Sequence, residues 1–171
     1  EGAKRRHVRQ YFEDCYIEGD VDFIFGSATA VFNKCEIFSK NRFSSMNSDF
    51  NSWITAASTP IESCYGYVFL NCKLTGDAPA NSVYLGRPWR SHAKVAFVRC
   101  WMGPHIKLEG WHNWGKAENE LTVSYAEYQS AGPGADSDRR VNWSRQLSDE
   151  EVGEFQVNDI LSGKDHWAPQ T

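Results

Sequence analysis

Short runs of apolar residues alternate with polar stretches along the chain, and each run is bounded by Gly, Asn, Asp or Ser. The runs are rich in aromatic and β-branched residues, which favour strands, and long helical periodicity is absent. Strands are predicted over residues 21–25, 30–38, 66–74 and 94–102. The stretch 39–60 is polar and rich in Ser and Asn, which is typical of a long loop.

A motif of the form Phe-x-x-Cys-x-(Ile/Leu/Met) recurs four times, beginning at Phe12, Phe32, Phe69 and Phe97. A residue that returns about every 20 to 30 positions, with short β-rich segments between, is typical of a solenoid whose coils stack like residues. The pattern therefore predicts an all-β fold, a right-handed parallel β-helix, with loops inserted in some coils. A β-sandwich that contains four such motifs is the alternative.

The sequence pattern near the C-terminus no longer predicts strands. Ser148 followed by Glu151 is a capping-box pattern that opens a short helix. We expect a short helical tail that packs on the solenoid. The length of 171 residues fits a single domain over 1–171.

One carboxylate, Asp22, lies inside one of the most apolar runs. Val21, Phe23 and Phe25 are two residues apart, as on one face of a strand, so Asp22 is expected on the opposite face. Such a carboxylate is either held by backbone N–H groups or an Arg, or takes part in chemistry.

The best candidate partner for Asp22 is Arg87, in Val83-Tyr-Leu-Gly-Arg-Pro-Trp-Arg90. Pro88 biases Arg87 toward extended backbone, so Arg87 and Trp89 are expected to project to the same side. A guanidinium beside a flat aromatic surface suits holding a carboxylate while a sugar stacks alongside. The alternative is a turn with an exposed Arg and a packed Trp.

Four ordered segments together resemble the pectin methylesterase (pectinesterase) family. The resemblance covers roughly residues 9 to 167. It implies a parallel β-helix that hydrolyses methyl esters of galacturonate in pectin (homogalacturonan), giving pectate and methanol without a metal or organic cofactor. The segments are Ile17-Glu-Gly-Asp-Val-Asp-Phe-Ile-Phe-Gly26, Tyr84-Leu-Gly-Arg-Pro-Trp89, Gly110-Trp-His-Asn-Trp-Gly115, and Gly132-Pro-Gly-Ala-Asp136 followed by Arg140-Val-Asn-Trp143.

The resemblance also implies roles for individual residues. Asp22 matches the nucleophile that attacks the ester carbonyl, and Arg87 matches the Arg that orients and ionises it. Trp89 and Trp111 match aromatic residues that line the sugar subsites. The family also uses a second Asp as general acid and base, and Gln amides at the oxyanion, from upstream motifs that residues 1–8 do not match.

The chain is therefore expected to be the C-terminal half of an esterase, a solenoid truncated at its N-terminal end. Open strand edges there favour self-association or assembly with the missing N-terminal half. The net charge of −4 provides no basic field for nucleic acid, and no run approaches the roughly 20 apolar residues of a membrane span. No apolar signal region opens the chain, and the family implies a secreted, extracellular protein of the cell wall.

Five cysteines leave at least one free thiol in a monomer. Their spacing lacks a C-x-x-C pair, so no zinc cluster is predicted. Cys15 and Cys35 match positions where some family members carry a disulfide.

Other functions stay open at this point. A Ser or Cys hydrolase would need a Gly-x-Ser-x-Gly elbow, which the sequence lacks, and a metal set of His105, Glu109 and His112 has no helical register. A pectate lyase would hold calcium with clustered acids such as Glu18, Asp20 and Asp22. A non-catalytic pectin-binding module would keep the aromatic groove without the acid.

Overall fold

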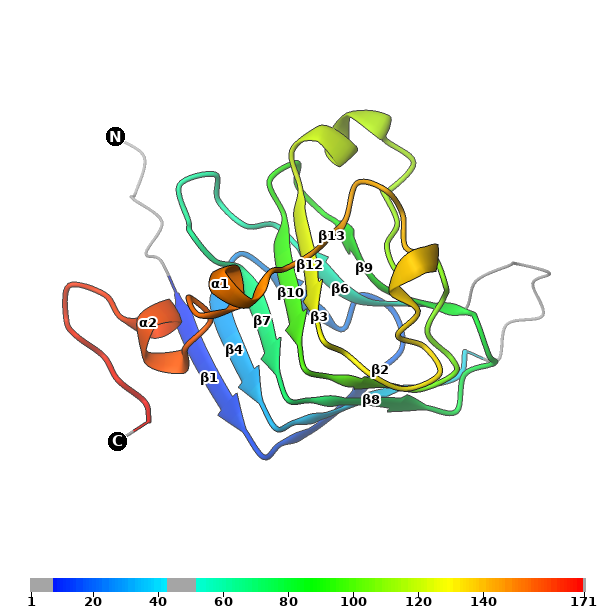
Figure 1. Cartoon of the computed structure of the whole chain (residues 1–171), viewed down its shortest axis with the longest axis horizontal. Coiled ribbons are helices and arrows are strands. Elements are labelled where there is room, and N and C mark those ends of the chain that lie inside the picture. The colour runs from blue at the N-terminus through cyan, green and yellow to red at the C-terminus, as the bar shows by residue number, and fades with distance from the viewer. Residues whose placement is uncertain (1–7, 43–51, 171) are drawn as a thin grey trace.

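The computed structural model describes residues 8–42 and 52–170. Their strands form three sheets around one core, and within these residues every strand pairing is parallel. The result is the parallel β-helix that the repeat predicts (Figure 1). The six-stranded sheet has the order β1-β4-β7-β10-β12-β13, the four-stranded sheet β11-β8-β5-β2, and the three-stranded sheet β3-β6-β9. The strands are β1 Arg9–Glu13, β2 Tyr16–Gly19, β3 Ile24–Gly26, β4 Thr29–Asn33, β5 Glu36–Ser39, β6 Ser52–Ala57, β7 Tyr67–Leu70, β8 Lys73–Gly76, β9 Val83–Pro88, β10 Lys94–Val98, β11 Trp101–Met102, β12 Ser124–Tyr128 and β13 Arg145–Gln146.

A tight corner joins the six-stranded sheet to the four-stranded sheet in each coil. At this corner a residue with φ between 51° and 54° precedes the repeated cysteine; these residues are Asp14, Lys34, Asn71 and Arg99. A left-handed residue turns the chain within one position. The segments 30–38, 66–74 and 94–102, predicted as single strands, are therefore each two strands joined at such a residue.

The four repeated phenylalanines form a ladder through the core. Ring centroids are 4.9 Å apart for Phe12 and Phe32, 4.7 Å for Phe32 and Phe69, and 4.4 Å for Phe69 and Phe97, with nearly parallel planes. These distances match the strand spacing of a sheet, so the rings stack because the backbones do.

The repeated cysteines stack beside the phenylalanine ladder, and three of them are fully buried. All five cysteines are thiols in this structure, including Cys15 and Cys35. Burial raises the pKa of the Cys35 thiol to about 11.

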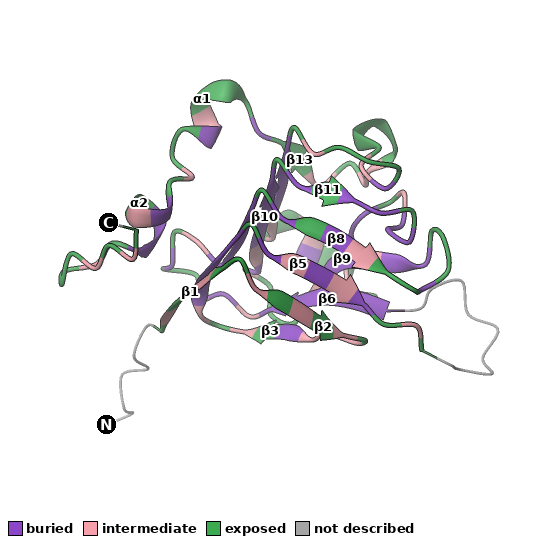
Figure 2. Ribbon diagram, turned by 90° about the horizontal axis from the view of Figure 1, so that it is seen from below, coloured by how far each residue is buried: buried purple, intermediate pink, exposed green. Residues whose placement is uncertain are grey.

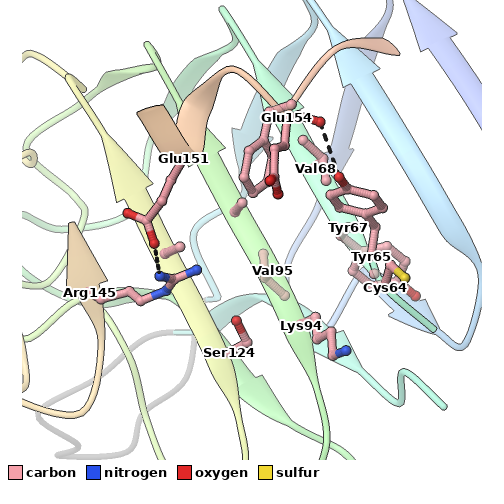
Figure 3. A pocket seen from close by; sticks show the side chains of 14 residues that line it. Cys64, Tyr65, Tyr67, Val68, Lys94, Val95, Ser124, Arg145, Glu151 and Glu154 are labelled. Atoms are coloured by element: carbon pink, nitrogen blue, oxygen red, sulfur yellow. Dashed lines mark hydrogen bonds and ion pairs between the residues drawn. The ribbon is translucent and has the colours of Figure 1, made fainter. Parts of the chain in front are cut away.

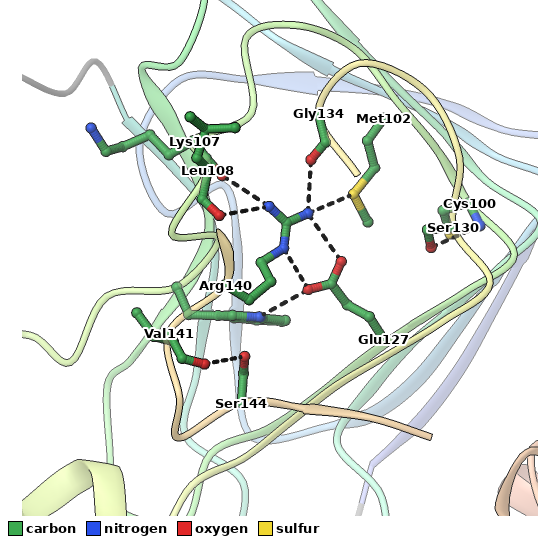
Figure 4. A network of polar contacts seen from close by, with 11 residues as sticks. Cys100, Met102, Lys107, Leu108, Glu127, Ser130, Gly134, Arg140, Val141 and Ser144 are labelled. Carbon is green, nitrogen blue, oxygen red and sulfur yellow. Dashed lines mark hydrogen bonds and ion pairs between the residues drawn. The ribbon is translucent and has the colours of Figure 1, made fainter. Parts of the chain in front are cut away.

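A fifth coil follows that lacks the Phe-x-x-Cys motif, because the residue in register with Phe97 is Glu127. The Glu127 side chain is 4% exposed and pairs with Arg140, which is 2% exposed (Figure 4). Arg140 also donates to three backbone carbonyls, those of Lys107, Leu108 and Gly134. A satisfied polar network thus closes the C-terminal end of the core.

The C-terminal segment carries the predicted helical tail. Helices α1 (Asp149–Val152) and α2 (Val157–Leu161) lie on the outer face of the six-stranded sheet (Figure 1). Ser148 and Glu151 form the expected capping box. Two short 3₁₀ turns span Ala117–Leu121 and Ser137–Arg139. No helix in the described residues is long and apolar enough to cross a bilayer.

The first coil forms the opposite, open end of the stack. Strands β1, β2 and β3 each lie at the edge of their sheet, and β2 is much less buried than the strands behind it (Figure 2). An apolar hollow of about 270 Å³ opens at this end, lined by residues such as Phe12, Ile17 and Phe23. The core is therefore closed by polar groups at one end only.

The prediction of a continuous loop over 39–60 is wrong for part of that stretch. Residues Ser52–Ala57 form β6, which is buried throughout and pairs with β3 and β9. Its polar members are accommodated by hydrogen bonds, such as Thr55 Oγ1–H to the Leu85 carbonyl at 2.9 Å. The middle of the stretch, 43–51, lies outside the described residues.

Candidate active site

Asp22 lies two residues before the short strand β3, at the open end of the solenoid. Its φ is 50°, and its N–H donates to the Trp53 carbonyl at 2.8 Å. The strand predicted over 21–25 begins only at Ile24, and its expected core face is wrong there: Ile24 faces the core, while Phe25 is 63% exposed. The left-handed residue breaks the two-residue alternation, which assumes extended backbone at every position.

Arg87 lies in β9 and reaches across the three-stranded sheet to Asp22. Its Nε donates to Asp22 Oδ1 at 2.9 Å and its Nη2 donates to Oδ2 at 2.6 Å. The two side chains are 16% and 20% exposed. This two-point ion pair fixes both the distance and the plane of the carboxylate. The structure thus brings together the two residues that the sequence predicted as partners.

The indole rings of Trp53 and Trp114 both lie over the guanidinium of Arg87. Arg87 Cζ lies 3.5 Å from the Trp53 ring centroid and 3.8 Å from that of Trp114. Neither Trp was predicted at the site, because Trp53 lies in the stretch expected to be a loop. Trp114 was visible only as part of the Gly110–Gly115 motif.

An open hollow of about 340 Å³ lies above the ion pair. Its walls are Val21, Asp22, Phe25, Ala56, Trp89 and Trp114. Trp89 is 44% exposed and its ring centroid is 5.7 Å from that of Phe25. The hollow therefore combines one carboxylate with exposed aromatic surface.

Trp111 does not reach this hollow, and its predicted role as a sugar platform does not fit the structure. It is 1% exposed, stacks on Tyr125 with a centroid distance of 4.2 Å, and its Nε1–H points to Glu127 Oε1 at 3.4 Å. The ring fills the core at the end of the phenylalanine ladder. Of the two Trp residues in that motif, Trp114 is the one beside Asp22.

His105 and His112, which were considered as metal ligands from the sequence, are both at least partly shielded from water. His112 packs against Trp53 and Tyr84, and burial together with the nearby Arg87 charge lowers its pKa. Burial lowers the pKa of His105 to about 4. Within residues 8–42 and 52–170, no group of three or more His, Cys, Asp or Glu side chains is arranged to hold a metal ion.

The three acids that could mimic a calcium site have separate partners. Glu18 pairs with Lys40 at 3.0 Å, and Asp20 accepts from the Val21 N–H at 2.7 Å. Asp22 is occupied by Arg87. A carboxylate held by a cation is a poor calcium ligand, so this geometry does not favour a lyase site.

A second hollow, of about 320 Å³, lies outside the six-stranded sheet beneath the tail (Figure 3). Two polar contacts lie at its rim: Arg145 pairs with Glu151, and Tyr65 Oη–H donates to the Glu154 carbonyl at 3.1 Å. The Asp22 hollow, in contrast, contains a carboxylate held by a two-point ion pair beside exposed aromatic rings. We therefore place the candidate site at Asp22.

Comparison with known proteins identifies the family of the chain. The Pectinesterase family model matches residues 5–164. Pectinesterase 31 of Arabidopsis thaliana is 45% identical over 150 residues, which cover 87% of this chain and 44% of that protein. Putative pectinesterase 11 of the same plant is 41% identical over 159 residues, covering 93% and 43%.

Solved structures give the same result. A pectin methylesterase in complex with a hexasaccharide aligns with a TM-score of 0.78 and 31% identity, covering 96% of this chain and 53% of that one. Pectin methylesterase from carrot aligns with a TM-score of 0.80 and 27% identity, covering 94% and 52%. The chain spans about half the length of the proteins it matches. Over that span, the chain is a member of the pectinesterase family.

Proposed function

We propose that this chain carries the nucleophile half of an esterase site that removes methyl esters from galacturonate units of pectin, giving pectate and methanol. The observation that carries the proposal is the two-point Asp22–Arg87 ion pair at the base of an aromatic hollow. Arg87 orients the carboxylate through two hydrogen bonds, and the exposed ring of Trp89 offers a face on which a sugar can stack.

The reaction would proceed in two steps. An Asp22 oxygen attacks the ester carbonyl carbon, and the tetrahedral intermediate then releases methoxide, which takes a proton from a general acid and leaves as methanol. Water then attacks the remaining acyl anhydride on Asp22, and it passes one proton to the conjugate base of the general acid and one to solvent. That second step releases the galacturonate carboxylate and restores Asp22.

We expect the general acid and the oxyanion donors to come from outside the hollow described here. Asp22 is the only ionisable group among the described residues that line it. Strand β3 is the edge of its sheet, and a strand added there would lie about 4.8 Å away, beside Asp22. An upstream coil of the family, with its Gln-Asp-Thr motif, would bring the second Asp to that position.

If the site is completed by an upstream segment, the chain has two binding partners. The polysaccharide partner is pectin, and the protein partner is an N-terminal half that pairs with β1, β2 and β3. The open apolar end of the core favours this pairing or, without it, self-association. By family membership we also expect the protein to act outside the cell, in the cell wall.

Methanol release from methylated pectin tests the proposal. The purified chain is assayed alone and after mixing with the N-terminal half of a related esterase. We expect essentially no activity alone, since losing one oxyanion donor costs about 10²–10³ in rate and losing the acid about a further 10²–10⁴. Full activity of the chain alone would show that another residue here supplies the proton.

The nucleophile is tested in the active mixture. Asp22→Asn keeps the shape of the side chain but removes its charge, and we expect it to abolish methanol release with folding intact. Asp20→Asn, two residues away and outside the hollow, is the matched control. An Asp22→Asn chain that keeps more than about a tenth of the activity would rule out nucleophilic catalysis by Asp22. A mixture that binds pectin but never releases methanol would favour the non-catalytic binding module.

A further inference from the structure

We infer that Trp53 and Trp114 are positioning residues, which clamp the guanidinium of Arg87 between their rings and hold it in the plane that Asp22 requires. This inference rests on the proposed function, because it concerns the same site. The two indole rings approach Arg87 Cζ from their faces, at 3.5 Å and 3.8 Å.

The edge and the faces of the planar guanidinium make different contacts. Its edge donates the two hydrogen bonds to Asp22, while aromatic rings lie over Cζ. A planar guanidinium stacks well on aromatic faces, and the interaction strengthens when water is excluded. With the Arg87 side chain only 16% exposed, tilting the fork away from Asp22 would cost ring contact as well as hydrogen bonds.

The backbone around Trp114 is built for this placement. Trp114 has a φ of 64°, a left-handed backbone conformation that residues other than glycine rarely adopt. Gly115 follows with a φ of 68°. Two side chains hold the turn: His112 Nδ1 accepts from the Trp114 N–H at 3.1 Å, and Asn113 Oδ1 accepts from the Gly115 N–H at 2.8 Å. The surroundings of Trp114 therefore hold this bulky residue in a conformation that it would not adopt by itself.

Trp53 provides the fixed side of the clamp. It is 6% exposed in the central strand of the three-stranded sheet, and its ring stacks on Tyr84 with a centroid distance of 6.2 Å and an interplanar angle of 10°. Trp114 is half-buried and also lines the hollow. The clamp thus has a rigid inner ring and an outer ring beside the substrate.

Proton exchange of the Arg87 Nε–H tests the clamp without any turnover. The chain is labelled with ¹⁵N-arginine, and the signal is assigned by its loss in Arg87→Lys. In the unaltered chain we expect slow exchange with water, because this proton is bonded to Asp22 Oδ1. Trp114→Leu keeps apolar bulk but removes the aromatic face, and Trp114→Phe keeps a smaller face.

We expect exchange about tenfold faster in Trp114→Leu, which corresponds to about 1.4 kcal/mol, and less than about threefold faster in Trp114→Phe. Trp101→Leu, at a 43% exposed Trp on the four-stranded sheet, is the control and should leave the signal unchanged. Trp114→Met serves as a second ringless variant if Trp114→Leu unfolds.

Equal exchange in the unaltered chain and the ringless variant would overturn the clamp, and so would a Phe variant as fast as the ringless one. The second result would mean that bulk, not the aromatic face, holds Arg87. Absence of methanol release from the unaltered chain mixed with its complementing half would count against the proposed function alone. The exchange measurement distinguishes the two because it needs neither pectin nor a second half.

Discussion

Replacing Arg140 with Met would break the polar closure of the core at its C-terminal end (Figure 4). Arg140 and Glu127 are paired at 2.8 Å and almost fully buried. Without Arg140, the carboxylate keeps only the long contact from the Trp111 indole, at 3.4 Å. Leaving one member of a buried ion pair unpartnered costs about 3–5 kcal/mol. For a chain of this size, that lowers the melting temperature by about 6–20 °C.

The measurement is reversible urea unfolding of Arg140→Met, followed by far-UV circular dichroism. Arg139→Met, at an exposed neighbouring position, should change the free energy of unfolding by less than about 0.5 kcal/mol. Loss of less than about 1 kcal/mol in Arg140→Met would contradict the reasoning, since it would mean that water reaches Glu127 freely.

A double variant separates the buried charge from the lost packing. Glu127→Phe combined with Arg140→Met extends the phenylalanine ladder by one rung, because position 127 is in register with Phe97. Replacing a buried pair by apolar residues is often neutral or stabilising, so the double variant should recover about 2 kcal/mol relative to Arg140→Met. It should stay below the unaltered chain, since three backbone carbonyls lose their donor. A double variant no more stable than the single one would show that the unpaired charge is not the cause.

Three further predictions concern other parts of the molecule. His105 is buried with no partner for Nε2, and burial lowers its pKa from 6.5 to about 4. Neutral His105 therefore contributes fully to the free energy of unfolding above pH 6.5, and this contribution is lost as the pH falls toward 4. In unfolding titrations across this range, His105→Gln should remove about 3 kcal/mol of the pH dependence. Phe69→Ala should cost about 3–5 kcal/mol in urea unfolding and Phe12→Ala, at the open end, less than about 2; equal losses would contradict the one-sided closure of the core. In the complemented esterase, Arg87→Lys should lower turnover, because an ammonium cannot reproduce the fork, while Trp89→Ala should chiefly raise KM; normal turnover of Arg87→Lys would count against the pairing.

Local pattern was sufficient for the repeated parts of the fold. The Phe-x-x-Cys motif predicted stacked coils because in-register stacking requires like residues at like places, and the ladder of Phe12, Phe32, Phe69 and Phe97 confirms it. The capping box of the tail was also readable, since Ser148 and Glu151 act within one turn. The fifth coil could not be predicted from the motif, because Glu127 stands there in place of phenylalanine and Ser130 in place of the cysteine.

The sequence by itself determined the solenoid, the family, and Asp22 and Arg87 as a candidate pair, because each depends on a short motif or on a repeat. Only the tertiary structure decided how these residues meet. Asp22 has a left-handed backbone conformation and lies before β3 rather than within a strand. Arg87 reaches it from β9, which lies two strands away from β3 in the sheet. The structure also decided that Trp111 is core while Trp53 and Trp114 enclose the guanidinium. The physical reason is that one-dimensional spacing fixes which residues share a coil position, whereas backbone φ and packing between coils fix where each side chain points.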